Sequence, residues 1–152
     1  MRQIREATLD DIERIMPLVE ELNRFAKNDE LGLKYDLESA QIFATTFIER
    51  QNATIFIAED NGAIVGAMAL VLLPWDLNHN QKIVLEQAWY IDPTERGKGL
   101  NKWMLDLAEY WGHLKGATTL IMCSIETNQR SLKNLYNKNG FKRVSTSYLK
   151  EI

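Results

Sequence analysis

Residues 85 to 107 combine three local signals that together constrain the fold more than any other stretch of the chain. An apolar run ending at Ile91 is followed by a short basic turn with two glycines, and then by apolar residues at helical spacing. Gly97 and Gly99 let the backbone bend and let a ligand approach without a side chain in the way. The N–H groups of the turn and of the helix start favour an anion such as a phosphate. The pattern therefore predicts a strand, a phosphate-binding turn and a helix.

The remaining hydrophobic patterns predict an α/β fold with a mixed sheet and helices on both faces. Pro17 is expected to kink or break the first helix, Asn61-Gly62 predicts a hairpin turn, and Pro74 to Gln81 reads as a polar loop. Strands are expected at residues 2–7, 54–58, 63–73, 83–91, 120–124 and 141–148, and helices at residues 8–25, 36–49, 100–114 and 129–137.

Length and composition limit the class of protein. The 152 residues predict one domain, residues 1–152, that is large enough to bury a core. No apolar run approaches the roughly 20 residues that span a bilayer, so no membrane partner is expected. The net charge of −3 argues against a nucleic-acid partner, because such proteins usually carry a basic surplus. A single cysteine, Cys123, is compatible with a reducing compartment, so a cytoplasmic location is expected.

Six residues around the basic turn stand at the spacing of a known motif: Trp89, Ile91, Pro93, Arg96, Gly99 and Asn101. They resemble the central motif of the GNAT superfamily of acetyl-CoA-dependent N-acetyltransferases, with Asn101 where the family has a small residue. The resemblance implies a centrally splayed sheet and acetyl-CoA as the co-substrate. It also implies that the turn wraps the pyrophosphate of coenzyme A, through Arg96, Gly97, Lys98, Gly99, Leu100, Asn101 and Lys102.

A second stretch, residues 135 to 141, reads Leu-Tyr-Asn-Lys-Asn-Gly-Phe and fits the family's Leu-Tyr-x-x-x-Gly-Phe. The resemblance implies that Tyr136 lies near the thioester sulfur and protonates the leaving thiolate. It also implies a cofactor contact from an Asn near the start of this helix, which is Asn128 here, one residue before the family's usual position. Only eleven residues follow Phe141, where relatives often place two strands. The acceptor side is therefore expected to be open or to be completed by a second subunit of a homodimer.

Acetyl transfer to an amine needs a base, since a lysine-like amine has a pKa of about 10.4 and must lose a proton to attack. Strand alternation places Glu86 and Gln87 on opposite faces, and a β-bulge would bring Glu86 into the cleft. Glu86 as base, a water ordered by Gln87, and Glu126 all stay open. The oxyanion needs donors, and the resemblance implies the backbone N–H groups of three residues in the fourth strand: Trp89, Tyr90 and Ile91.

The expected function is transfer of an acetyl group from acetyl-CoA to a primary amine by direct attack in a ternary complex. The amine is a small cationic compound or a protein lysine or N-terminus. One alternative is a non-catalytic acyl-CoA-binding regulatory module, and another is a toxin that acetylates aminoacyl-tRNA, which the acidic charge disfavours. His79 and His113 have no Cys or carboxylate partner at ligand spacing, so no metal is expected.

Overall fold

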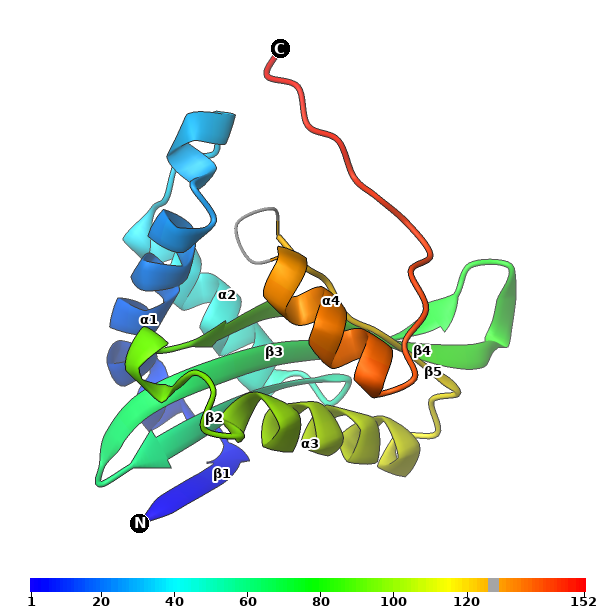
Figure 1. Ribbon diagram of the computed structural model, residues 1–152, viewed down its shortest axis with the longest axis horizontal. Coiled ribbons are helices and arrows are strands. Elements are labelled where there is room, and N and C mark those ends of the chain that lie inside the picture. The colour runs from blue at the N-terminus through cyan, green and yellow to red at the C-terminus, as the bar shows by residue number, and fades with distance from the viewer. Residues whose placement is uncertain (126–128) are drawn as a thin grey trace.

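Five strands form one mixed sheet in the order β1-β2-β3-β4-β5 (Figure 1). The structure is a computed structural model and describes residues 1–125 and 129–152. The first four strands pair with one another in an antiparallel arrangement, and the fifth is parallel to the fourth. The strands are β1 (Arg2–Glu6), β2 (Ala53–Asp60), β3 (Ala63–Trp75), β4 (Asn78–Ile91) and β5 (Thr119–Ile121).

Helices cover both faces of this sheet, which confirms the predicted fold class. α1 (Ile12–Phe25) and α2 (Leu37–Glu49) pack on one face, and α3 (Leu100–Leu114) packs on the other with α4 (Gln129–Lys138) beside it (Figure 1). Strand alternation explains why there are two cores. In β2, Ile55 and Ile57 are buried against α1 and α2, whereas Phe56 and Ala58 are buried against α3.

Local signals place several element boundaries where they were predicted. The Asn61-Gly62 turn is left-handed at both residues, with φ of 50° and 84°, and joins β2 directly to β3. Asp36 caps α2 by accepting a hydrogen bond from the backbone N–H of Ser39 at 2.8 Å. None of the helices in the described ranges is long and apolar enough to cross a membrane.

Of the two outcomes expected for Pro17, a kink or a break, the break is wrong. α1 runs without a break through Pro17, because the proline and the carbonyl that it leaves unpaired, that of Glu13, lie on the exposed side of the helix. Residues 74–81 do not form the predicted loop, because β3 continues to Trp75 and β4 begins at Asn78. Both faces are exposed at this end of the hairpin, so polar residues are compatible with a strand there.

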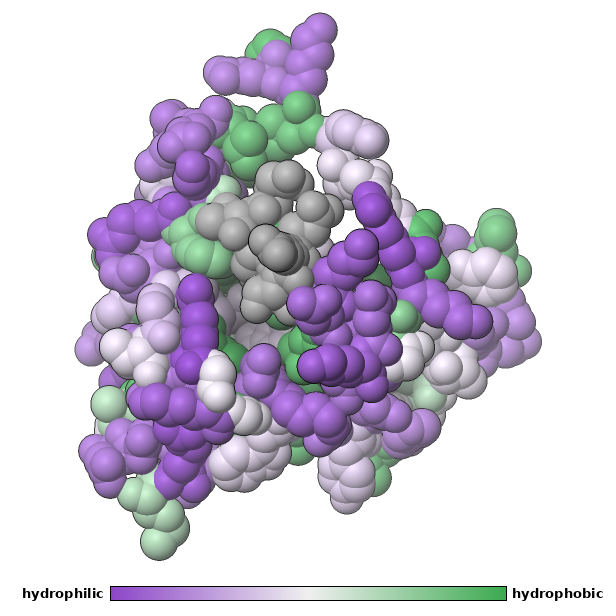
Figure 2. All heavy atoms as spheres, in the orientation of Figure 1, coloured by the Kyte–Doolittle hydropathy of each residue, from purple (hydrophilic) through white to green (hydrophobic). Residues whose placement is uncertain are grey.

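The predicted strand at residues 141–148 is also wrong. Residues 141–152 are irregular and almost wholly exposed, and the pairs recorded for β5 are with β4 alone. The segment runs away from the sheet towards the 3-10 helix η2 (Asn28–Leu31), where Glu151 lies against Gly32 (Figure 1). Figure 2 shows apolar surface at this end of the molecule. Without a neighbouring strand the backbone polar groups of the segment remain in solvent.

Candidate active site

The pairing between β4 and β5 stops in the middle of β4. The paired residues are Ile83, Val84 and Leu85 of β4 with Thr119, Leu120 and Ile121 of β5. β4 continues to Ile91 and remains paired with β3 along its other edge. Residues 86–91 therefore present one backbone edge that has no β5 partner among the described residues, and the site is built around this edge.

A β-bulge begins at the same point. Ala69 pairs with Ala88 and Leu70 pairs with Glu86, so Gln87 is an extra residue without a partner on β3. The bulge shifts the alternation of side chains, so that Glu86 shares the α3 face with Trp89 and Ala88 points to the α1 face. Glu86 is 7% exposed, whereas Gln87 is exposed. The alternative in which a bulge reorients Glu86 is thus the one that the geometry matches.

The side chain of Glu86 contacts Cys123, two residues after the end of β5. The backbone N–H of Cys123 donates to Glu86 Oε2 at 2.9 Å, and Cys123 Sγ lies 3.7 Å from the carbonyl oxygen of Glu86. Burial raises the pKa of Glu86 from 4.5 to about 7, although the Cys123 N–H partly stabilises the carboxylate. A carboxyl with a pKa near neutrality can accept and release a proton at physiological pH.

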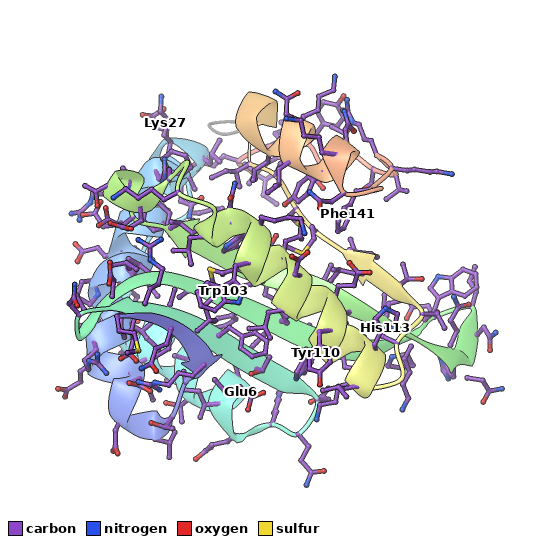
Figure 3. All side chains as sticks on the ribbon, turned by 60° about the horizontal axis from the view of Figure 1, so that its bottom comes forward. Glu6, Lys27, Trp103, Tyr110, His113 and Phe141 are labelled. Carbon is purple, nitrogen blue, oxygen red and sulfur yellow. The ribbon has the colours of Figure 1, made fainter. Side chains whose placement is uncertain are left out.

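Tyr136 meets the same residue from α4. Its hydroxyl donates to the carbonyl oxygen of Cys123 at 2.6 Å, and its ring packs on Phe141 at 5.2 Å between centroids. Figure 3 shows Phe141 beside α4. Gly140, with φ of 80°, turns the chain after the helix, and the N–H of Phe141 bonds back to the Tyr136 carbonyl at 3.0 Å. Burial, with Glu86 nearby, raises the pKa of Tyr136, so its phenol stays protonated at neutral pH.

The basic turn leads from β4 into α3. Gly97 and Gly99 are left-handed, with φ of 76° and 83°, and α3 begins at the next residue, Leu100. No atom lies within 4 Å of a Cβ built on either glycine, so the backbone conformation rather than lack of space requires glycine there. Lys98 is exposed and bonds Glu95 at 3.2 Å. The Asn101 side-chain oxygen accepts from the N–H of Lys102 at 2.8 Å, which occupies one donor at the helix start.

Arg96 points away from this turn towards α1. Its Nε–H donates to the Ile91 carbonyl at 3.0 Å, and its guanidinium lies 4.7 Å from the ring centre of Phe25 and 5.2 Å from that of Tyr90. The two rings also contact each other edge to face at 5.8 Å. In this structure the side chain of Arg96 therefore belongs to a contact between β4 and the end of α1, while its backbone belongs to the turn.

The other predicted residues lie on β4 or outside the described part of the chain. Trp89, Tyr90 and Ile91 end the strand opposite Met68, Ala67 and Gly66. The indole Nε1 of Trp89 is buried and has no hydrogen-bond partner among the described residues. Asn128 and Glu126 lie outside the described residues. Within residues 1–125 and 129–152, no three His, Cys, Asp or Glu side chains form a group that could hold a metal ion.

A small apolar cavity of about 40 Å³ lies on the α1 face of the same part of β4. Its walls include Leu18 and Leu22 of α1, Phe43 of α2, and Ala88 and Tyr90 of β4. The cavity therefore lies on the opposite face of the sheet from Glu86.

A model described as the acetyltransferase (GNAT) family matches residues 15–141, which is most of the chain. The chain belongs to this family. The prediction made from the two motifs is therefore confirmed, and the protein is a GNAT acetyltransferase.

Relatives of this GNAT protein agree in sequence and in fold. The uncharacterized N-acetyltransferase YhfO of Bacillus subtilis (strain 168) is 27% identical over 138 residues, which cover 91% of this chain and 88% of the relative. A ribosomal-protein-alanine N-acetyltransferase from Brucella melitensis biovar Abortus 2308 superposes with a TM-score of 0.75 at 17% identity, over 100% of this chain and 99% of that one. A predicted acetyltransferase from Clostridium acetobutylicum, solved with acetyl-CoA, superposes with a TM-score of 0.76 at 17% identity, over 99% of this chain and 96% of that one.

Two contacts in this GNAT site gave no signal in the sequence. Cys123 takes part mainly through its backbone N–H and carbonyl, which any residue would supply. Phe25 was expected at the end of the first helix, and its contact with Arg96 was not predicted. The cue that could have found Phe25 is the position of an aromatic residue at the end of that helix, but nothing in the sequence says that it meets Arg96.

Proposed function

We propose that residues 1–152 form one catalytic domain that transfers the acetyl group of acetyl-CoA to a primary amine by direct attack. The observation that carries this proposal is the convergence of Glu86 and Tyr136 on the backbone of Cys123, beside the unpaired edge of β4. One group has a pKa suited to taking a proton and the other keeps a proton to give. That is the pair of functions which aminolysis of a thioester requires.

The proposed step replaces the C–S bond of the thioester with a C–N bond. The amine nitrogen forms a bond with the thioester carbonyl carbon, and the C–S bond breaks as the tetrahedral intermediate collapses. Glu86 takes the proton that the amine nitrogen loses, directly or through a water ordered by Gln87. Tyr136 gives its proton to the departing thiolate sulfur, so that an amide and a free thiol result. The proton on Glu86 then passes to the phenolate of Tyr136, either directly or by exchange through solvent, so both groups return to their starting states.

The co-substrate is proposed to lie along the unpaired edge of β4. The backbone N–H groups of Trp89, Tyr90 and Ile91 are the candidate donors to its thioester and pantetheine, and the buried indole N–H of Trp89 is a further unmatched donor there. The turn at residues 96–102 is the proposed site for the pyrophosphate, because left-handed glycines and the start of a 15-residue helix aim N–H groups outward. Asn128 is proposed as a further contact to the cofactor.

The acceptor is proposed to be a cationic amine, since the chain carries a net charge of −3. The segment between α1 and α2, residues 26–36, is named the acceptor loop here, because it begins directly after Phe25, whose ring contacts Arg96 of the basic turn. A protein N-terminus is one acceptor class within this proposal, as the name of the Brucella relative illustrates for that protein.

The first experiment measures thiol release from acetyl-CoA with a panel of polyamines, aminoglycosides, lysine peptides and N-terminal peptides. Wild type is expected to release thiol only with an amine present. Tyr136→Phe and Glu86→Gln are each expected to lower kcat by about 10²–10⁴-fold, because each removes one proton-transfer group. The rate of wild type should rise as the pH passes through about 7, where Glu86 ionises.

Matched controls separate this result from a general loss of folding. Tyr110→Phe and Glu109→Gln make the same chemical changes at exposed positions of α3, and both should keep the wild-type rate. Figure 3 shows Tyr110 on α3, away from α4. If the protein binds acetyl-CoA but releases no thiol with any amine of the panel, this result would contradict catalysis and favour a regulatory module. A separate assay with aminoacyl-tRNA tests the remaining alternative, and thiol release with that acceptor alone would point to a tRNA-directed enzyme.

A further inference from the structure

Arg96 connects two parts of the molecule that have separate tasks in the proposed function. Its backbone precedes Gly97 in the basic turn, and its N–H bonds the Pro93 carbonyl at 3.4 Å. Its guanidinium is held by the Ile91 carbonyl and lies on the rings of Phe25 and Tyr90. Phe25 is the last residue of α1, and the acceptor loop begins immediately after it.

The acceptor loop has few other anchors. η2 contains no buried residue. Lys27, directly before η2, has a left-handed φ of 55°, and a residue other than glycine keeps this conformation only when the surrounding structure holds it. One side-chain hydrogen bond, from Asn28 to Asn23 at 3.0 Å, ties the loop back to α1. Farther along, Glu151 lies against Gly32, and Asp36 caps α2. The position of the first residues of the loop therefore depends on where the end of α1 is held, and Arg96 holds that end through Phe25.

We propose that Arg96 is a positioning residue that couples occupancy of the basic turn to the ordering of the acceptor loop. The inference rests on the proposed function, because it takes the turn as the coenzyme A site. A pyrophosphate that orders the backbone of residues 96–102 also fixes the root of the Arg96 side chain. The guanidinium then holds Phe25 and the first residues of the loop, so binding of the co-substrate prepares the acceptor side.

Hydrogen exchange with and without saturating coenzyme A tests this coupling, and it needs no knowledge of the acceptor. In wild type, coenzyme A should slow exchange both in residues 96–102 and in residues 26–36. Phe25→Leu leaves the turn and Arg96 in place but removes the aromatic face. It should keep the protection of residues 96–102 and lose most of the protection of residues 26–36. Tyr110→Leu also removes an aromatic ring, at an exposed position of α3, and should behave as wild type.

Steady-state kinetics supply a second readout. With the amine identified in the panel, Phe25→Leu should raise KM for the amine about threefold at saturating acetyl-CoA, the size expected for an exposed cation–π contact, with kcat little changed. Lys98→Ala should instead raise KM for acetyl-CoA, because Lys98 lies on the same turn without contacting α1.

Two results would overturn the coupling. One is protection of residues 96–102 in wild type with no change in residues 26–36. The other is protection of residues 26–36 that survives in Phe25→Leu. If coenzyme A protects neither segment in wild type, the proposed coenzyme A site itself fails, and this outcome is distinct from failure of the coupling alone.

Discussion

Glu86 is a buried carboxyl that accepts one hydrogen bond from the described part of the chain, from the backbone N–H of Cys123. A carboxylate in such a place lacks the solvation that it has in the unfolded chain, which is why burial dominates the rise of its pKa to about 7. The same burial that suits it to accept a proton near neutral pH makes its ionised form unfavourable for the fold.

Glu86→Gln should therefore stabilise the protein at pH 8. The folded pKa is raised above the unfolded one, so the stabilising contribution of the protonated form is fully present below about pH 4.5 and is lost as the pH rises through about 7. The shift corresponds to about 3 kcal/mol above that range. The amide keeps an oxygen for the Cys123 N–H and does not ionise. Its Tm should exceed that of wild type at pH 8, and the difference should shrink towards pH 5.

Thermal unfolding at pH 5, 6.5 and 8 checks this expectation. Glu109→Gln, at an exposed position of α3, should show no such dependence on pH. A gain in Tm that is the same at pH 5 and pH 8 would mean that Glu86 does not ionise across this range in the folded protein.

At the scale of elements, the basic turn depends on two left-handed glycines placed directly before α3. Gly99 has φ of 83°, and Gly62, in the hairpin between β2 and β3, has φ of 84°. Neither has an atom within 4 Å of an added Cβ. Both positions therefore require a left-handed backbone conformation, and neither is sterically crowded. They differ only in the proposed role of the turn in which each one lies.

Gly99→Ala and Gly62→Ala should each lower the free energy of unfolding by about 1 kcal/mol, the usual cost of a left-handed conformation for alanine. Gly99→Ala should also weaken acetyl-CoA binding, since a relaxed turn no longer aims its N–H groups together. Gly62→Ala should leave the Kd unchanged. Urea denaturation and titration calorimetry measure the two effects. Equal Kd values for the two variants would show that the turn does not bind the cofactor.

At the scale of the whole molecule, a cluster of four charged residues joins β1, η1 (Leu9–Asp11), α1 and β2. Arg5 and Arg14 each contact both Asp11 and Glu59, at distances of 2.7 to 3.0 Å. Both carboxylates are buried, and the arginines hold their pKa values well below the usual range. The cluster ties the start of α1 to β1 and β2, and β1 is the edge strand of the sheet farthest from β5.

Asp11→Asn should lower the free energy of unfolding by about 2 kcal/mol at pH 7, because it leaves two arginines partly unpaired. The depressed carboxylate pKa values mean that this stability is present above about pH 4.5 and is lost as the pH falls, so the difference between variant and wild type should narrow in acid. Glu20→Gln breaks an exposed pair with Arg24 and should cost under about 1 kcal/mol. If both variants lower the free energy of unfolding by a similarly small amount, the cluster contributes no more than an exposed ion pair.

The amino-acid sequence alone determined the features that depend on interactions between residues close together in the chain. The strand–turn–helix at residues 85–107, the hairpin at Asn61-Gly62 and the family follow from glycine conformation, hydrophobic periodicity and two local motifs. These signals arise within a few residues of one another, so no partner segment is needed to read them. Tyr136 was predicted as a site residue in the same way.

Only the tertiary structure decided how the pieces meet. The bulge at Gln87 is a property of β4 paired with β3, and the end of pairing at Leu85 is a property of β4 beside β5, so neither appears in the sequence of one strand. The contact of Arg96 with Phe25 joins residues about seventy positions apart, and the unpaired segment at residues 141–148 reflects the absence of a neighbouring strand. Such features depend on which segments come together in space, whereas local propensity records only what each segment favours by itself.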